Sequence, residues 1–475
     1  MACNRQRNAL AGGPEGVRRD HLGLWEGEES GRLRGERQFP GRRDCRGPRG
    51  RLETRRLRGM EDPVTPATIS SDAPAPDSTY AWRRLAASLA LSTIGGVGLW
   101  SAVIVLPTIE VEFGVGRGGA SLPYTATMVG FAAGGVMMGR WADRAGIKLP
   151  LILGTLMLGV GFAVAAMAAT YWQFVVAQAL LIGMLGSSVT FGPLVADVSL
   201  WFLRKRGIAV AIVASGNYLA GAIWPFLLQW AIGAVGWRHA YMGVGAFCVL
   251  TMLPLALLLR RRAATEDRRG YARKGEALIQ PPMPPALLQG LLVMAGLSCC
   301  IAMSMPQVHI IAYCGDLGYG PARGAQMLSL MLGFGIVSRL ASGYISDHIG
   351  GLGTLILGST LQCLTLAFYL PFNGLISLYI VSSLFGLSQG GIVPSYAVIV
   401  REYFPAREAG ARISLVLMTS VIGMAVGGWM SGVIYDLTGS YRAAFLNGIA
   451  FNLVNMAIAF WLLMGRIRMR PSLAS

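Results

Sequence analysis

An arginine lies within an apolar segment of the second half of the chain, in the sequence Gly335-Ile-Val-Ser-Arg339-Leu-Ala-Ser-Gly343. Placing a guanidinium in hydrocarbon costs about 2.5–3.5 kcal/mol on insertion scales, so an arginine there needs a reason. Arginine stays charged and offers a planar pair of donors that matches the two oxygens of a carboxylate. Arg339 is therefore a candidate anion-binding residue. The alternatives are that it extends to the nearby membrane surface or pairs with Asp347.

Five other polar residues in apolar segments are candidates for contact with a bound substrate: Asn217, Tyr124, Gln389, Tyr396 and His309. Polar side chains inside helix bundles also bond to neighbouring helices, which is the alternative for each of them. A histidine can gain or lose a proton near neutral pH. His309 is therefore a candidate for proton coupling, for a hydrogen bond to the substrate, or for a structural role at the outer end of its helix.

Signatures of enzymes and of bound cofactors are not found in the sequence. It contains no GxxxxGK[ST] phosphate loop, no HExxH and no GxSxG. The seven cysteines show no CxxC and no zinc-site spacing with histidine. We expect a protein that is not an enzyme and that holds no metal and no cofactor, so any solute movement would be secondary transport.

The elements that position these residues are long apolar segments. The chain is 53% hydrophobic and 14% charged, whereas soluble proteins carry about 25% charged residues. About 20 apolar residues cross a bilayer as a helix. The sequence predicts an all-α integral membrane protein with twelve such helices, at residues 84–107, 121–139, 149–169, 173–198, 208–231, 240–259, 287–311, 323–342, 353–370, 374–399, 411–434 and 443–464.

The charge distribution predicts the orientation of these helices. The net charge of +17 does not form a face for nucleic acid, because the basic residues gather between the apolar segments and in the first 60 residues. With the N-terminus inside, the inner connections and the C-terminal end hold nineteen Arg and Lys and the outer connections hold four. The positive-inside rule then places both termini in the cytoplasm of a multi-pass protein of the inner or plasma membrane.

The predicted organisation is two bundles of six helices. Residues 1–82 are rich in Arg, Gly, Pro and Ser and are expected to be a disordered tail. Met60 is an alternative start, and a contact of the basic tail with anionic lipid is the functional alternative. The remaining boundaries are a first bundle at 83–262, a cytoplasmic linker at 263–285, a second bundle at 286–466 and a C-terminal tail at 467–475.

The two halves carry a repeated loop. Gly139-Arg140-Trp-Ala-Asp143-Arg144-Ala-Gly146 in the first half matches Gly343-Tyr-Ile-Ser-Asp347 in the second. The first glycine allows close helix packing, Gly146 permits a tight turn and Asp143 can face a helix N-terminus. Asp197 can pair with Arg140 or Arg144. A parallel repeat of this kind indicates two bundles that rock around a central cavity.

These features resemble the major facilitator superfamily over roughly residues 84–466. The resemblance implies that the repeated loop latches the inner gate of the outward-open state; topology signals and solvated charges are the alternative. Residues 106–114, 201–217 and 308–318 resemble the monocarboxylate transporters and bacterial oxalate/formate antiporters. This branch implies that Arg339 faces the central cavity and holds the substrate carboxylate.

The sequence departs from that branch at several positions. Gly335 stands where animal monocarboxylate carriers have an acidic residue, and the basic residues of helices one and eleven are missing. One cavity cation fits one carboxylate. We therefore expect a monomeric carrier of a small organic anion, a monocarboxylate, coupled to protons and working by alternating access. An exporter of apolar or cationic compounds and a membrane sensor without transport are the alternatives.

Overall fold

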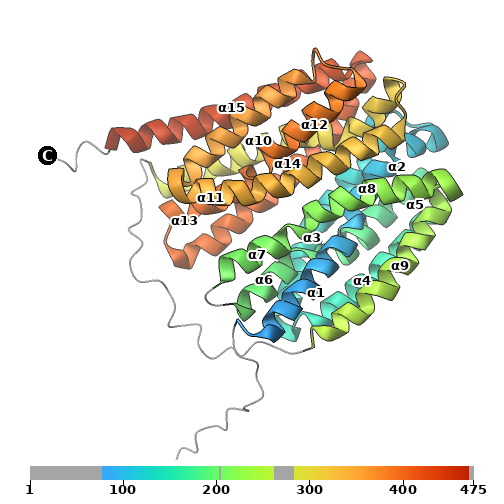
Figure 1. Ribbon diagram of the computed structural model, residues 1–475, viewed down its shortest axis with the longest axis horizontal. Helices are drawn as coiled ribbons and strands as arrows, with labels where there is room; N and C mark the ends of the chain where they lie inside the picture. The colour runs from blue at the N-terminus through green and yellow to red at the C-terminus, as the bar shows by residue number, and fades with distance from the viewer. Residues whose placement is uncertain (1–76, 203–204, 261–282, 470–475) are drawn as a thin grey trace, which may run out of the picture. The chain divides into compact units, whose positions relative to one another are not determined.

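The computed structural model describes residues 77–202, 205–260 and 283–469, and Figure 1 shows that these residues form helices and short connections. Within those ranges there is no β-strand. The predicted tail is therefore described only from residue 77, and most of the predicted linker lies outside the described residues. The prediction of an all-α membrane protein is confirmed.

The first half is built from apolar helices that pack mainly with one another. A π-helical stretch, η1, and a short 3-10 turn, η2, interrupt the helix that crosses fourth. The elements are α1 (Thr79–Gly95), α2 (Val97–Phe113), α3 (Arg117–Ala145), α4 (Lys148–Ala166), α5 (Tyr171–Val176), η1 (Ala177–Gly186), η2 (Ser187–Thr190), α6 (Gly192–Trp201), α7 (Arg206–Ala214), α8 (Gly216–Val235) and α9 (Trp237–Leu258).

The second half repeats this organisation with longer continuous helices. The elements are α10 (Pro285–Asp316), α11 (Pro321–Phe368), α12 (Leu375–Gln389), α13 (Ile392–Tyr403), α14 (Ala406–Thr438) and α15 (Tyr441–Met469). Their main contacts are again with one another. The two halves meet where α3 packs on α14, α8 on α11 and α2 on α10.

Ten described helices are long and apolar enough to cross a membrane. One of them, α11, has 48 residues and contains Gly350 at φ 77°, outside the helical region. At 1.5 Å per residue it would be about 72 Å long, far more than a bilayer needs, so it holds two spans. The Gly-rich α3 is not among the ten. Counting α11 twice and adding α3 gives the twelve predicted spans.

Three spans consist of two helical segments each. The segments α1 and α2 meet at Gly96, α7 and α8 at Ser215, and α12 and α13 at Gly390–Gly391. The backbone angles at these junctions lie in the right-handed helical region, so each pair forms one span with a local irregularity. Two of these junctions, at Ser215 and Gly390, adjoin the candidate site described next.

Candidate functional site

Arg339 lies on α11 at the contact between the two halves. Its Nη1 donates to the carbonyl oxygen of Ala214 at 3.1 Å, and its Nε lies 3.5 Å from the carbonyl oxygen of Gly390. The guanidinium carbon is 4.4 Å from the centre of the Tyr218 ring. In the part of the chain that the structure describes, no carboxylate forms an ion pair with Arg339.

One of the predicted alternatives for Arg339 is a pair with Asp347. Asp347 is exposed and does not contact Arg339 among the described interactions, so the pairing of the two is not what the structure shows. The arginine side chain instead turns toward α7 and α8 of the first half and is partly buried. It thus stands between the halves with its charge uncompensated by any described acid.

Gly335 and Tyr218 together explain one departure from the monocarboxylate-carrier pattern. The Tyr218 ring lies against Gly335, and a Cβ atom at position 335 would overlap the ring. An acidic side chain therefore does not fit at 335 while Tyr218 is in place. Sequence reasoning missed Tyr218, although it lies next to Asn217. Its ring supplies a cation–π contact that holds the Arg339 guanidinium.

Asn217 and Tyr124 both have buried polar atoms without a partner among the described residues. Asn217 is the second residue of α8, and its backbone carbonyl lies 3.4 Å from Nε1 of Trp100 while its Oδ1 is unpaired. Tyr124 is 1% exposed, and its ring lies against Gly428 of the second half. Unpaired buried groups are uncommon in proteins, so both are open to a ligand or to water.

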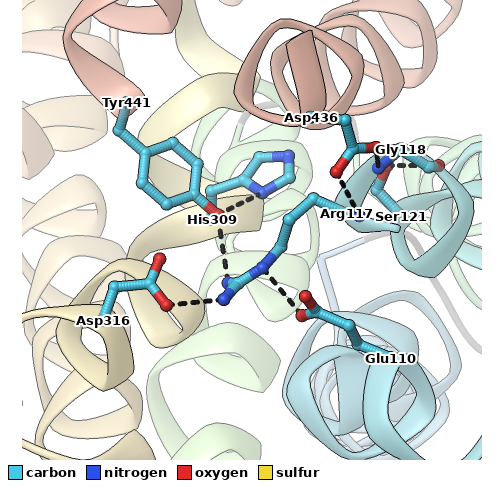
Figure 2. A network of polar contacts seen from close by, with 8 residues as sticks. All are labelled: Glu110, Arg117, Gly118, Ser121, His309, Asp316, Asp436 and Tyr441. Atoms are coloured by element: carbon cyan, nitrogen blue, oxygen red, sulfur yellow. Dashed lines mark hydrogen bonds and ion pairs between the residues drawn. The ribbon is translucent and has the colours of Figure 1, made fainter. Parts of the chain in front are cut away.

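His309 lies elsewhere, in a polar network that joins the halves near one end of the bundle (Figure 2). Its ring is fully buried. Nε2 lies 2.8 Å from the carbonyl oxygen of Gly428, and Nδ1 lies 3.2 Å from the hydroxyl of Tyr441. Because a carbonyl only accepts, Nε2 carries the hydrogen and Nδ1 accepts from Tyr441.

Arg117 is the centre of this network, as Figure 2 shows. Its Nη1 donates to the Tyr441 hydroxyl at 3.2 Å and its Nη2 donates to Asp316 at 2.6 Å. Its Nε lies 2.7 Å from an oxygen of Glu110. Arg117 and Glu110 belong to the first half, whereas Asp316 and Tyr441 belong to the second. The sequence analysis counted Arg117 only as a loop charge.

Asp436 adds a second link at the same end. Its two oxygens accept from the backbone N–H groups of Arg117 and Gly118 at 2.7 and 2.8 Å (Figure 2). These groups begin α3, where free N–H groups and the helix dipole favour a negative charge. We call this region of the bundle the Arg117 end, and the opposite end, which holds Arg140, the Arg140 end.

His309 and Arg339 lie at different depths. Counted from the Arg117 end, His309 precedes the last residue of α10 by seven positions, and Arg339 follows the first residue of α11 by eighteen. At 1.5 Å per residue these are about 10 and 27 Å along the helices. The structure therefore does not bring the predicted substrate-binding residues His309 and Arg339 together.

The predicted latch residues lie at the Arg140 end. Arg140, Asp143 and Arg144 are exposed, and the described interactions include no ion pair or hydrogen bond of their side chains. Gly146 has φ 82° and ends α3 in a tight turn. Gly139 and Gly343 lie within helices with open space around them. A latch formed by this loop in another conformation stays a prediction.

Asp197 has a different partner from the one predicted. Nε and Nη2 of Arg84 donate to its two oxygens, each at 2.8 Å, in place of Arg140 or Arg144. Arg84 is buried, and its guanidinium also lies over the Trp201 ring at 4.7 Å. The pair joins α1 to α6, which are in contact in the structure. Sequence reasoning missed Arg84 because it stands at the start of the first apolar segment.

No group of three or more His, Cys, Asp or Glu that could hold a metal ion occurs among the described residues. Five cysteines are described as free thiols, and four of them are buried. The chemistry that this arrangement supports is binding of an anion between two halves.

Comparisons with known proteins agree with this architecture. A family model described as Major Facilitator Superfamily matches residues 88–381 and 354–473. Monocarboxylate transporter 13 of Rattus norvegicus is 26% identical over 322 residues, which are 67% of this chain and 73% of that protein. The MFS-type transporter opdF of Penicillium oxalicum is 25% identical, covering 85% and 95%. The agnestins efflux protein AgnL12 of Paecilomyces divaricatus is 24% identical, covering 70% and 75%.

Solved structures with a similar fold are also transporters. A bacterial homologue of the human lysosomal transporter Spinster, inward-facing and unoccupied, has a TM-score of 0.60 and 13% identity, covering 82% of this chain and 96% of that one. A mutant of the peptide transporter POT in complex with sulfate has a TM-score of 0.64 and 13% identity, covering 81% and 94%. At these identities the likeness concerns the fold alone.

Proposed function

As the chain belongs to the Major Facilitator Superfamily, we propose that this transporter carries a small organic anion, a monocarboxylate, together with a proton by alternating access. The observation that carries the proposal is Arg339, a guanidinium between the halves that no described carboxylate neutralises. A carboxylate substrate would supply the missing charge. The resemblance to a monocarboxylate transporter over 67% of the chain supports the same substrate class.

The number of charges favours one carboxylate on the substrate. The two arginines that are buried in the described residues have their own acids, since Arg84 pairs with Asp197 and Arg117 pairs with Glu110 and Asp316. A buried charge that lacks a partner is unfavourable, so a second carboxylate would find no free guanidinium. Asn217, which lies on α8 beside Tyr218 and has an unpaired side-chain oxygen, would complete the contacts of the substrate, whereas Tyr124 lies against Gly428, near His309.

We assign the proton to His309 and its network rather than to direct contact with the substrate. The chain of hydrogen bonds runs from Arg117 through Tyr441 to His309, and so connects the halves. A second proton on His309 would occupy Nδ1, and the Tyr441 hydroxyl would then lose its acceptor. Proton uptake would thereby weaken the link at the Arg117 end, which we place outside, with both termini in the cytoplasm of an inner or plasma membrane.

Uptake into proteoliposomes tests the proposal. A panel of labelled monocarboxylates would be offered under an inward proton gradient to the wild-type protein, Arg339→Gln, Arg339→Lys and Arg323→Gln. Loss of a buried charge partner costs about 2–5 kcal/mol, so Arg339→Gln should lower kcat/KM at least about 30-fold. Arg339→Lys keeps the positive charge but lacks the planar pair of donors, so its kcat/KM should lie between those of the wild type and Arg339→Gln.

Arg323→Gln is the matched control, because Arg323 is an exposed arginine on the same helix that contacts only Gln326 among the described residues. Its uptake should equal that of the wild type. Equal uptake by Arg339→Gln would remove Arg339 from the site, and no uptake of any acid by the wild type would reject the substrate class.

Efflux is the second candidate function, because one relative is itself named an efflux protein. The same preparation distinguishes the two directions. Preloaded vesicles that lose the acid faster under an outward proton gradient than they accumulate it under an inward one would favour an exporter.

A further inference from the structure

Two buried glutamines of the second half form an amide pair that is only half satisfied. Gln307 on α10 is 2% exposed, and Gln389 at the end of α12 is fully buried. Nε2 of Gln307 donates to Oε1 of Gln389 at 2.6 Å. Oε1 of Gln307 and Nε2 of Gln389 have no partner among the described residues.

The unused groups are one acceptor and one donor, whichever way the amides are turned. If both side chains were flipped, Gln389 would donate to Gln307, and the free groups would be the N–H₂ of Gln307 and the carbonyl of Gln389. The pair therefore always presents a donor beside an acceptor. Buried amides without partners are unfavourable, so this pair needs a ligand group or water to complete it.

The pair is a neighbour of Arg339. Gly390 directly follows Gln389, and its carbonyl oxygen is 3.5 Å from Nε of Arg339. Counted from the Arg117 end, Gln307 lies nine residues into α10, Gln389 fourteen into α12 and Arg339 eighteen into α11. These positions correspond to depths of about 13, 21 and 27 Å. The glutamine pair therefore lies between the level of Arg339 and the level of His309, on the Arg117 side of the arginine.

We propose that Gln307 and Gln389 bind the end of the substrate opposite its carboxylate, and that this end is a neutral group that both donates and accepts hydrogen bonds. A hydroxyl or a primary carboxamide has both capacities, whereas a carboxylate only accepts and a methyl group does neither. The substrate class is thus a short acid with a hydroxyl or carboxamide at its far end. This inference rests on the proposed function of Arg339 as the carboxylate site.

Two pairs of labelled acids test the proposal. Pentanoate and 4-hydroxybutyrate have the same number of chain atoms but end in a methyl group and a hydroxyl. Succinate and succinamate differ in ending in a carboxylate or a carboxamide. A site built to bond a polar group rejects an analogue that lacks it, so wild-type kcat/KM should favour 4-hydroxybutyrate over pentanoate, and succinamate over succinate, by at least about tenfold.

The double variant Gln307→Leu/Gln389→Leu removes both amides. Replacing both partners by apolar groups of similar shape leaves no buried polar atom unpaired, so this protein should fold better than either single variant. The preference for 4-hydroxybutyrate over pentanoate should disappear or reverse, while kcat/KM for pentanoate is kept or raised.

Gln362→Leu is the matched control. Gln362 is another fully buried glutamine of the second half, and its amide contacts Cys299. Its replacement should leave the preference for 4-hydroxybutyrate unchanged even if expression falls.

The two hypotheses fail in different ways. Wild-type uptake of simple acids, with equal kcat/KM for the members of each pair or with the same preference in the double variant, would overturn the glutamine site and leave the carboxylate site intact. The glutamine site would also be overturned, and the carboxylate site kept, if the wild type takes up shorter acids but none of the four acids of these two pairs. No uptake of any acid by the wild type would overturn the carboxylate site and the glutamine site with it.

Discussion

Whether an arginine of this protein can bind an anion depends on the partners that its guanidinium already has. Arg339 has carbonyl and aromatic contacts but no described acid, whereas Arg117 has two acids and a tyrosine. The first arrangement is open to an anion and the second is already neutralised. His309 belongs with the second arrangement, because both of its ring nitrogens have partners.

A prediction follows for His309→Gln. The glutamine amide can still donate to the Gly428 carbonyl and accept from Tyr441, but it takes up no proton near neutral pH. Transport down the concentration gradient of the acid should persist, and its acceleration by an inward pH gradient should be lost. Labelled uptake at equal and unequal pH measures this. His239→Gln, at an exposed histidine that contacts only the Val235 carbonyl, should keep the acceleration; a retained acceleration in His309→Gln would assign the proton elsewhere.

At the scale of elements, the contact of α8 with α11 shapes the site. Small residues let membrane helices approach closely, and Gly335 of α11 accepts the Tyr218 ring of α8. That ring in turn lies against the guanidinium one turn further along α11. The Tyr218 ring thus both fills the contact between the two helices and positions the Arg339 guanidinium.

Gly335→Ala should therefore act on substrate binding. The added methyl would displace the Tyr218 ring, and the cation–π contact that it weakens contributes about 0.5–2 kcal/mol. We expect KM for a transported acid to rise about 2- to 30-fold. Gly333→Ala, on the same helix, would meet only Ala222 at 3.9 Å and is the control. The same KM in both variants would show that Tyr218 does not position Arg339.

At the scale of the whole molecule, the described ion pair that crosses between the halves, Arg117 with Asp316, lies at the Arg117 end. Glu110 and Arg117 meet Asp316 and Tyr441 there, and Asp436 binds the start of α3. At the Arg140 end, the pairs of Arg84 with Asp197 and of Arg412 with Glu408 each remain within one half. Opening the Arg117 end therefore requires these crossing contacts to break.

Tyr441→Phe should shift the equilibrium between the two orientations. The variant keeps the ring and removes the hydroxyl that joins Arg117 to His309. A lost hydrogen bond to a charged group costs about 1.5–3 kcal/mol, which changes the ratio of the two states by at least tenfold. Val111 and Leu437 are both strongly exposed at this end. Double electron–electron resonance between spin labels at these two positions should give a longer distance in Tyr441→Phe than in the wild type.

Tyr435→Phe is the control for that measurement. Tyr435 also lies against Arg117, with its ring 5.0 Å from the guanidinium, but its hydroxyl bonds Asp316 of the same half and so does not join the two halves. Its distance distribution should match that of the wild type, and an unchanged distribution in Tyr441→Phe would mean that the hydroxyl does not hold the halves together.

Much of the fold follows from the sequence because a bilayer demands long apolar helices. The twelve segments, and the family, were predictable from apolar length and the repeated glycine-containing loop. The local irregularities at Ser215 and Gly390 were not, since each lies inside a continuous apolar segment. Arg339 was found because a charge in hydrocarbon is conspicuous. Tyr218, Gln307 and the Arg117 network were missed because their roles depend on partners more than 80 residues away.

The uncompensated guanidinium of Arg339 has an electrical consequence. An empty carrier holds a positive charge at the site, and a carrier loaded with a carboxylate holds none there. When the halves rock, the charge stays in place while the side of the membrane to which it is exposed changes, so the empty protein moves part of an elementary charge through the field. A full charge crossing 100 mV corresponds to about 2.3 kcal/mol. An interior-negative voltage therefore favours the empty carrier open to the cytoplasm and slows its return. In the loaded carrier the carboxylate cancels the charge of Arg339, and the charge that remains is that of the proton carried with it.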